Sequence, residues 1–313
     1  MKSILAVDIG GTHMRAACFS NDTEIPSHIN RVKAQQGKNP RFLKLQQLIE
    51  SVWPDDGNVG WISVAAPGPL DSSRGILVAP PNIPEWHDFP IQELLQNRFD
   101  PPTLVGNDAN LAALGEWKFG AGRGHHHLIY LTISTGIGSG VIINDRLLTG
   151  NKGLAPELGH ITIQVDGPVC PCGQPGHLEG LAAGRAIEEW VHQEVLSGVE
   201  TSLIGIHQPT AEQIAAAANQ GDQLSISAFQ RAGEYIGLAL ASYLHIFNPT
   251  IIIIGGGVAR SGSLILSPIQ AALKKYVMIP QYLDGLEITF AQLGDNAGLM
   301  GALAQARYIQ DVS

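Results

Sequence analysis

The sequence contains few cysteines, no excess of positive charge and no long uninterrupted apolar run. Cys18, Cys170 and Cys172 are too few for a disulfide framework. The formal net charge of -9, from 19 Lys and Arg against 28 Asp and Glu, argues against a nucleic-acid surface, which needs a basic patch. No uncharged apolar run reaches transmembrane length, and the first residues lead into a short strand rather than a secretory signal. We therefore expect a reduced, cytoplasmic protein that binds neither nucleic acid nor membrane.

Two widespread nucleotide-binding signatures are also absent. The chain has no G-x-x-x-x-G-K-[ST] sequence and no G-x-G-x-x-G sequence before a helix, which makes a P-loop kinase or a Rossmann dehydrogenase the wrong class. It has instead 44% hydrophobic residues and 36 glycines, which indicate a large buried core with many tight turns. A length of 313 residues is typical of two domains.

Apolar runs and helical periodicities alternate along the chain. We expect strands over residues 4–7, 14–19, 61–65, 103–105, 128–133, 141–143, 251–254 and 286–290. We expect helices over residues 42–52, 109–119, 211–218 and 229–247 and from 297 onward. This alternation indicates an α/β fold. The layout of strand, glycine turn and strand occurs twice, around residues 8–12 and 134–138, which indicates two related lobes.

Three glycine-rich turns end apolar strands: Asp8 to Thr12, Thr135 to Gly140, and Gly255 to Gly257. A turn without Cβ atoms lets several backbone N–H groups converge on one anion. In open α/β sheets the ligand crevice lies at the carboxyl ends of the strands. One such turn is more often structural than functional, but three in this arrangement favour a phosphate site.

The order of these turns carries a resemblance. DIGGTHMR (residues 8–15) resembles the phosphate-1 motif of the superfamily of sugar kinases and actin, STGIGSG (134–140) resembles phosphate-2, and TIIIIGGG (250–257) resembles the adenosine motif. The resemblance implies an actin-like ATPase (RNase H-like) α/β fold. Two lobes would each hold a mixed β-sheet flanked by helices, with nucleotide and sugar in the interlobe cleft. It assigns ATP and Mg²⁺ to Asp8, Gly10, Gly11, Thr12, Arg15, Thr135, Gly136, Gly138, Gly255, Gly256 and Gly257.

Five further motifs narrow the resemblance. They are APGPLD (66–71), PNIPEW (81–86), GNDAN (106–110), PELGH (156–160) and the segment 170–179. In this order they resemble the ROK family of sugar kinases and repressors, over nearly the whole chain. The resemblance implies ATP-dependent phosphorylation of a hexose at its 6-hydroxyl, with glucose the first expectation, by a homodimer. Fructose, mannose, N-acetylmannosamine and N-acetylglucosamine stay open as substrates, and polyphosphate stays open as a donor.

Transfer of a phosphoryl group to a hydroxyl needs a carboxylate that accepts the hydroxyl proton. Asp108 suits this role, because it lies where a strand ends and a helix begins. On the residues alone, Asn107 or Asp108 could equally be a helix cap. The resemblance assigns Asp108 as the catalytic base. It assigns hexose binding to Asn107, Asp108, Glu157, His160 and Glu179, with Gly68 and Asn82 shaping the sugar pocket.

Four soft or borderline metal ligands lie within a short span: His160, Cys170, Cys172 and His177. Many ROK kinases hold a structural zinc on one His and three Cys, in the pattern C-x-C-G-x-x-G-C-x-E. This chain reads C-P-C-G-Q-P-G-H-L-E, so His177 replaces the third cysteine. Two cysteines and two histidines still form a suitable tetrahedral zinc set. We expect a structural Zn²⁺ that fixes the loop carrying His160 and Glu179, against the alternative of a metal-free loop.

The resemblance also predicts the domain boundaries. A small N-terminal α/β lobe would cover residues 1–118, with the C-terminal helix 298–313 packing back on it, and a large α/β lobe with the zinc loop would cover 119–297. Repressors of the family carry a helix-turn-helix domain before the kinase-like region, and here the first strand begins at Ile4. A non-catalytic sugar-sensing regulator is the remaining alternative, and the intact Asp108 argues against it.

Overall fold

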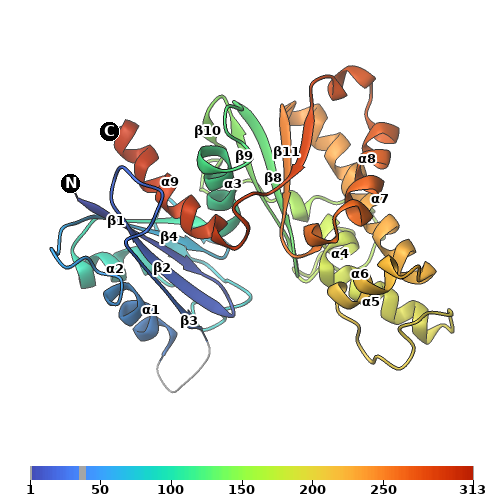
Figure 1. The fold of residues 1–313 in the computed structure, drawn as a ribbon, viewed down its shortest axis with the longest axis horizontal. Coiled ribbons are helices and arrows are strands. Elements are labelled where there is room, and N and C mark those ends of the chain that lie inside the picture. Colours follow the sequence, from blue (N-terminus) through green and yellow to red (C-terminus); the bar gives the residue numbers. More distant parts are fainter. Residues whose placement is uncertain (1, 35–39, 313) are drawn as a thin grey trace. The chain divides into compact units, whose positions relative to one another are not determined.

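The computed structural model describes residues 2–34 and 40–312, and residues 1, 35–39 and 313 lie outside the described part (Figure 1). The chain forms two compact units. Unit 1 consists of Met1–His125, Gly140–Pro156 and Ala291–Ser313, and unit 2 consists of His126–Ser139 and Glu157–Phe290. The chain therefore passes between the units at 125/126, 139/140, 156/157 and 290/291. The lobe boundary expected at residue 118 stays a prediction.

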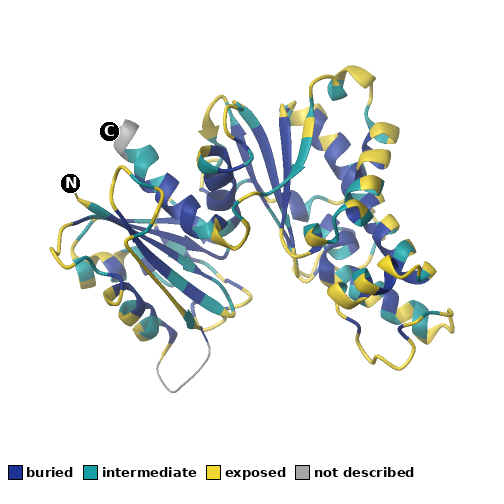
Figure 2. Cartoon of the chain, in the orientation of Figure 1, coloured by how far each residue is buried: buried dark blue, intermediate teal, exposed yellow. Residues whose placement is uncertain are grey.

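The first sheet has the strand order β3-β2-β1-β4-β7. Its strands are β1 (Ser3–Ile9), β2 (His13–Phe19), β3 (His28–Lys33), β4 (Val59–Ala66) and β7 (Thr103–Asn107). β2 is antiparallel to β1 and β3, whereas β4 is parallel to β1 and β7. The central strand β1 is apolar on both sides, which is typical of a strand covered on both faces. Figure 2 shows these central strands as the buried part of the unit.

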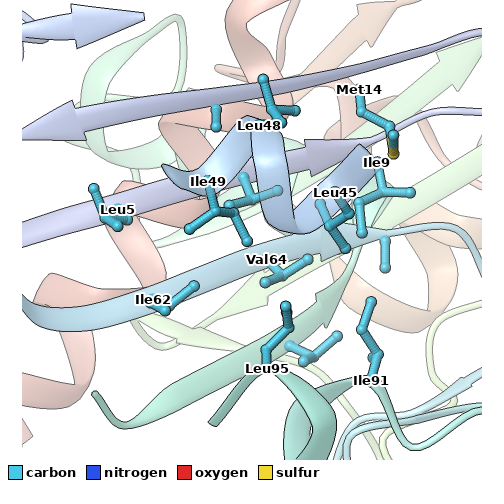
Figure 3. Packing of buried hydrophobic residues seen from close by; sticks show 14 of the residues in the cluster. Leu5, Ile9, Met14, Leu45, Leu48, Ile49, Ile62, Val64, Ile91 and Leu95 are labelled. Carbon is cyan, nitrogen blue, oxygen red and sulfur yellow. The ribbon is translucent and has the colours of Figure 1, made fainter. Parts of the chain in front are cut away.

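The two faces of this sheet carry different helices. The helices α1 (Arg41–Glu50), α2 (Ile91–Phe99), α3 (Asp108–Phe119) and α9 (Ala297–Val312) belong to unit 1. Leu5 and Ile9 of β1 form one core cluster with Leu45 of α1 and Leu95 of α2 (Figure 3). Ile4 is equally buried but is not part of that cluster, and α9 packs against β1 and β4. Each such fully buried Leu or Ile side chain stabilises the fold by roughly 1.5–3 kcal/mol.

The second sheet has the order β10-β9-β8-β11-β12. Its strands are β8 (His127–Ile133), β9 (Ile137–Ile143), β10 (Arg146–Leu147), β11 (Ile251–Gly255) and β12 (Glu287–Phe290). β9 is antiparallel to β10, and β11 is parallel to β8 and β12. β8 and β9 are neighbours in the sheet and are joined by a short turn, so the chain reverses direction between them. The order and the directions of the strands therefore repeat those of the first sheet.

Most helices of unit 2 come from its long second segment. They are α4 (Leu178–Ala182), α5 (Gly184–Leu196), α6 (Ala211–Asn219), α7 (Gln223–Phe247) and α8 (Ser263–Tyr276), with the short 3₁₀ helices η1 (Leu158–His160), η2 (Val258–Ser261) and η3 (Pro280–Leu283). The remaining elements belong to unit 1: the small hairpin β5 (Leu70–Asp71) and β6 (Ile76–Leu77), and η4 (Gly294–Asn296). Among residues 2–34 and 40–312, no helix is both long and apolar enough to cross a membrane.

Candidate active site

The carboxyl ends of the parallel strands β1, β4 and β7 form one edge of unit 1. The register pairs Asp8 with Ala65 and Ala66 with Asn107, so the ends of these strands lie side by side. Gly68 lies two residues after the end of β4 and precedes a cis peptide bond to Pro69. The predicted residues of the first glycine turn, of the APGPLD motif and of the GNDAN motif therefore gather at a single edge of the sheet.

The helix α3 begins at this edge with Asp108. The side-chain oxygen of Asn107 accepts hydrogen bonds from the backbone N–H groups of Ala109 at 3.0 Å and Asn110 at 3.1 Å, so Asn107 is the helix cap. Asp108 Oδ1 accepts a further hydrogen bond from the N–H of Ala109 at 2.8 Å. Asp108 is half-buried. Because Asn107 supplies the cap, Asp108 is not required for it.

The first glycine turn joins β1 to β2. The N–H of Gly10 donates to the carbonyl of His13 at 2.9 Å and closes the turn. The Arg15 guanidinium donates to Asp8 Oδ2 at 2.6 Å. Burial raises the pKa of Asp8, and Arg15 partly opposes this shift. Thr12 is exposed at the tip of the turn. The turn therefore presents a carboxylate–guanidinium pair as well as backbone N–H groups.

Two neighbouring segments fix this turn. A Cβ on Gly11 would lie 3.1 Å from the Cβ of Asn82, so the PNIPEW loop approaches the turn closely. Arg41, which is buried, donates to Glu85 Oε1 at 2.8 Å and to the carbonyl of Gly11 at 3.4 Å. The sequence analysis missed Arg41. An arginine at the start of a helix has the same sequence pattern whether it is buried and hydrogen-bonded or exposed at the surface.

The other two glycine turns lie in unit 2 and share one cavity. The N–H of Ser134 donates to the carbonyl of Gly136 at 2.8 Å and closes the turn between β8 and β9, and Gly138 lies in β9. Gly255 ends β11, and Gly256 has a φ of +87°, a conformation that favours glycine. The cavity has a volume of about 520 Å³ and is lined by residues that include Thr135 and Gly257.

The rest of this cavity is formed by helices distant in sequence. Its charged and amide lining residues are Arg185, Glu188, Glu212, Asn219 and Arg260. Glu188 Oε1 accepts the N–H of Ala211 at 2.8 Å, so α5 fixes the start of α6. Sequence reasoning found none of these residues, because they belong to no motif and only the fold brings them beside the glycine turns.

The candidate hexose ligands of unit 2 form a connected group. Glu179 Oε2 accepts the N–H of Ile137 at 2.8 Å, directly after Gly136 of the glycine turn. His160 Nε2 lies 3.9 Å from Glu157 Oε2. Burial raises the pKa of Glu157, the His160 ring opposes this shift, and the charge of Glu179 adds to it. These carboxylates and this imidazole offer several directional polar partners in one place, as binding of a sugar requires.

The four candidate metal ligands converge as well. One ligand atom each from His160, Cys170, Cys172 and His177 lies within 4.8 Å of the others. Cys170 Sγ is 3.7 Å from His160 Nδ1, and Cys172 Sγ is 3.2 Å from His177 Nδ1. Burial raises the pKa of the Cys170 thiol to about 12, with a contribution from the charge of Glu179. Cys170 Sγ also lies 3.5 Å from Glu179 Oε1, so this cluster touches a candidate hexose ligand.

The chain is similar to known proteins both in sequence and in fold. The model of the family described as ROK matches residues 4–308. A glucokinase of Thermotoga maritima is 35% identical over 304 residues, which cover 96% of this chain and 95% of that protein. A ROK family glucokinase from Streptomyces griseus, solved in complex with glucose and AMPPNP, is 31% identical, with a TM-score of 0.82 and coverage of 98% of this chain and 99% of that one.

A regulator is similar too. The structure of a ROK family transcriptional regulator, a homolog of the E. coli MLC protein, is 26% identical, with a TM-score of 0.87. The match covers 98% of this chain and 78% of the regulator. The same fold therefore occurs both in kinases and in regulators.

Proposed function

The chain belongs to the ROK family, and from this premise we propose that it is an ATP-dependent hexose kinase that converts glucose to glucose 6-phosphate. The observation that carries the proposal is the position of Asp108 at the end of β7, beside a residue that already caps α3. The glucokinases among its relatives and structural neighbours support glucose as the hexose and ATP as the donor.

Asp108 is the proposed general base. Its carboxylate accepts the proton of the sugar's 6-hydroxyl while the hydroxyl oxygen forms a bond to the γ-phosphorus and the bond to the ADP oxygen breaks. Asn107 orients the start of α3 through its two backbone hydrogen bonds. The hexose is held by Asn107, Asp108, Glu157, His160 and Glu179, with Gly68 and Asn82 shaping the pocket.

The nucleotide is proposed to occupy the cavity of unit 2. Thr135, Gly136 and Gly138 hold phosphates at the turn, and Gly255, Gly256 and Gly257 face the adenosine. Gly10, Gly11, Thr12 and Arg15 hold phosphates from the first turn. Magnesium, bound with ATP near Asp8, would neutralise phosphate charge. Asp8 fits this role because it is a carboxylate at the turn, held in place by Arg15.

The metal cluster fits a structural Zn²⁺. Two thiols and two imidazoles are a recognised tetrahedral set, in which bonds of about 2.0–2.3 Å place ligand atoms closer than 4 Å to each other. The present spread of up to 4.8 Å requires only a small contraction. With four protein ligands the metal leaves no open position, so its role is to stabilise the loop beside Glu179.

One assay tests the proposal. We expect ADP release from Mg-ATP in the presence of glucose, measured against fructose, mannose, N-acetylmannosamine, N-acetylglucosamine and a blank without sugar. A site that hydrogen-bonds a hydroxyl can reject a sugar lacking that partner by about 10⁴-fold. Faster turnover with another hexose would reassign the substrate within the same enzyme class. No ADP release with any sugar, together with sugar binding, would instead identify a sugar-sensing regulator.

Two expectations belong to the same proposal. A homodimer is the assembly that the family resemblance suggests, and a reducing cytoplasm is the compartment in which the thiols of Cys170 and Cys172 would remain metal ligands. Both stay predictions.

A further inference from the structure

The helix α3 contacts the chain near each of the four crossings, which are the places where the chain passes between the two units. At 125/126 the Nε1–H of Trp117 donates to the carbonyl of His125 at 2.7 Å. At 139/140 a Cβ on Gly140 would lie 2.4 Å from the Cβ of Ala113, so this residue packs directly on the helix. At 156/157 Asn110 Nδ2 donates to the carbonyl of Ala155 at 2.9 Å.

The fourth crossing depends on Glu116. After the chain re-enters unit 1 at Ala291, the N–H of Gln292 donates to Glu116 Oε2 at 3.2 Å and the N–H of Leu293 donates to Glu116 Oε1 at 2.8 Å. The N–H of Ala121, which precedes the first crossing, donates to Glu116 Oε2 at 2.9 Å. One side chain therefore binds the segments of two crossings that are distant in sequence.

The chemistry of this contact requires a carboxylate. Glu116 is fully buried, and its two oxygens accept three backbone N–H groups. An amide in its place would turn an NH₂ group toward one or more of these donors and leave them without an acceptor. Gly120 is adapted to the same contact, because a Cβ there would lie 2.1 Å from Glu116 Oε2.

We infer that Glu116, assisted by Trp117, is a positioning residue for the phosphoryl transfer. It ties both crossings to the helix whose first residue is Asp108, eight residues earlier in α3. Any shift of α3 against the crossings would move Asp108 relative to the rest of the chain, and a displacement of about 1 Å costs on the order of 10²-fold in rate. The inference rests on the proposed kinase activity.

The test compares two buried variants of unit 1. In Glu116→Gln we expect kcat to fall about tenfold or more, while the Kd for AMPPNP, measured by calorimetry, stays within about twofold of the wild-type value. AMPPNP binding should survive because the hydrogen-bond partners of Glu116, which are Ala121, Gln292 and Leu293, belong neither to the lining of the proposed cavity nor to the first glycine turn. The control is Ser63→Ala, which removes a buried hydrogen bond of 2.9 Å from Ser63 Oγ to Gln305 Oε1. It should lower Tm and leave kcat unchanged.

The possible outcomes distinguish the proposed kinase activity from the positioning role of Glu116. Wild-type protein that turns over no hexose would overturn the proposed function and this role with it. Active wild-type protein with a normal kcat in Glu116→Gln, or an equal loss of kcat in Ser63→Ala, would overturn the positioning role alone. Should Glu116→Gln not fold, Trp117→Phe provides the same test. It keeps an aromatic ring and removes the hydrogen bond to His125, and we expect a smaller fall in kcat at unchanged AMPPNP affinity.

Discussion

The two sheets repeat one arrangement of strands and differ in what they place at the strand ends. In both, a hairpin with a glycine turn is followed by two parallel strands on the other side of the first strand. The turn of unit 1 lies between the members of a charged pair, Asp8 of β1 and Arg15 of β2. The turn of unit 2 has no such pair and is contacted instead by the carboxylate of Glu179, which comes from α4.

The two sheets also differ in which parallel strand leads to candidate functional residues. In unit 1 it is the fifth strand, β7, which ends at the proposed base, whereas in unit 2 it is the fourth strand, β11, which ends in three glycines beside a cavity. Under the proposed function, the repeated fold serves proton acceptance at β7 of unit 1 and nucleotide binding at the cavity of unit 2. The comparison teaches that the chemistry is set by a few residues at strand ends rather than by the sheet itself.

The largest expected effect comes from substituting the proposed base, Asp108. In Asp108→Asn we expect kcat to fall by at least ~10²-fold, because the amide cannot accept the hydroxyl proton, while binding of the hexose persists. A coupled assay for ADP and calorimetry with glucose would measure the two quantities. Asp71→Asn is the matched control, since Asp71 accepts hydrogen bonds from Ser73 and Arg74 in a local turn. Near-normal turnover in Asp108→Asn would refute the role.

A second test is made at the turn of unit 2. In Gly136→Ala the new Cβ would lie 2.4 Å from Glu179 Oε2, so Glu179 must move away from the N–H of Ile137. Loss of a hydrogen bond to a charged group should raise the KM for the hexose by about tenfold. Gly257→Ala is the matched variant, because its Cβ would meet only Ser134 Oγ at 3.9 Å in the nucleotide cavity. It should raise the KM for ATP alone, and equal effects of both variants on the hexose would contradict the assignment.

The smallest expected effect comes from removing the metal. After dialysis against a chelator, the KM for glucose should rise several-fold, because the loop that holds Cys170 beside Glu179 is released while Glu179 keeps its bond to Ile137. Cys172→Ser should lower the zinc content and reproduce the effect. Cys18→Ser, a buried cysteine of unit 1 that is absent from the metal cluster, should retain the zinc. An unchanged KM in metal-free protein would reject the link between metal and sugar.

The family was predictable from the order of the motifs. The α/β fold and the central strands were predictable from the apolar runs and their alternation with helical periodicities. The elements that were missed have physical reasons. β3 is an exposed edge strand, so it has no apolar run. α8 contains Pro268, which in a sequence reads as a helix breaker. It is accommodated because α7 presents Gly233, where a Cβ would lie 2.6 Å from the proline ring.

The site was predictable only where it follows motifs. Asp108 and the glycine turns are marked by their places at strand ends. Arg185 and Asn219 of the cavity come from helices whose packing no local pattern records. Glu116 would read as an ordinary helical carboxylate, and only the structure shows that its oxygens accept hydrogen bonds from Ala121 and from Leu293, which are far apart in the sequence. Long-range pairing of this kind leaves no trace in a single sequence.

The packing of α9 has a consequence for synthesis. The helix covers β1 and β4, and a Cβ on Gly298 would lie 2.6 Å from the Cγ of Asp8. The ribosome releases β1 and β4 before α9, so these strands wait, with an apolar face uncovered, until α9 has emerged. The stretch from Glu157 to Phe290 is continuous and emerges earlier than α9. Unit 1, whose central strands precede the long segment of unit 2, therefore completes its folding after that segment has emerged, and it is the unit that a nascent-chain chaperone would have to shield.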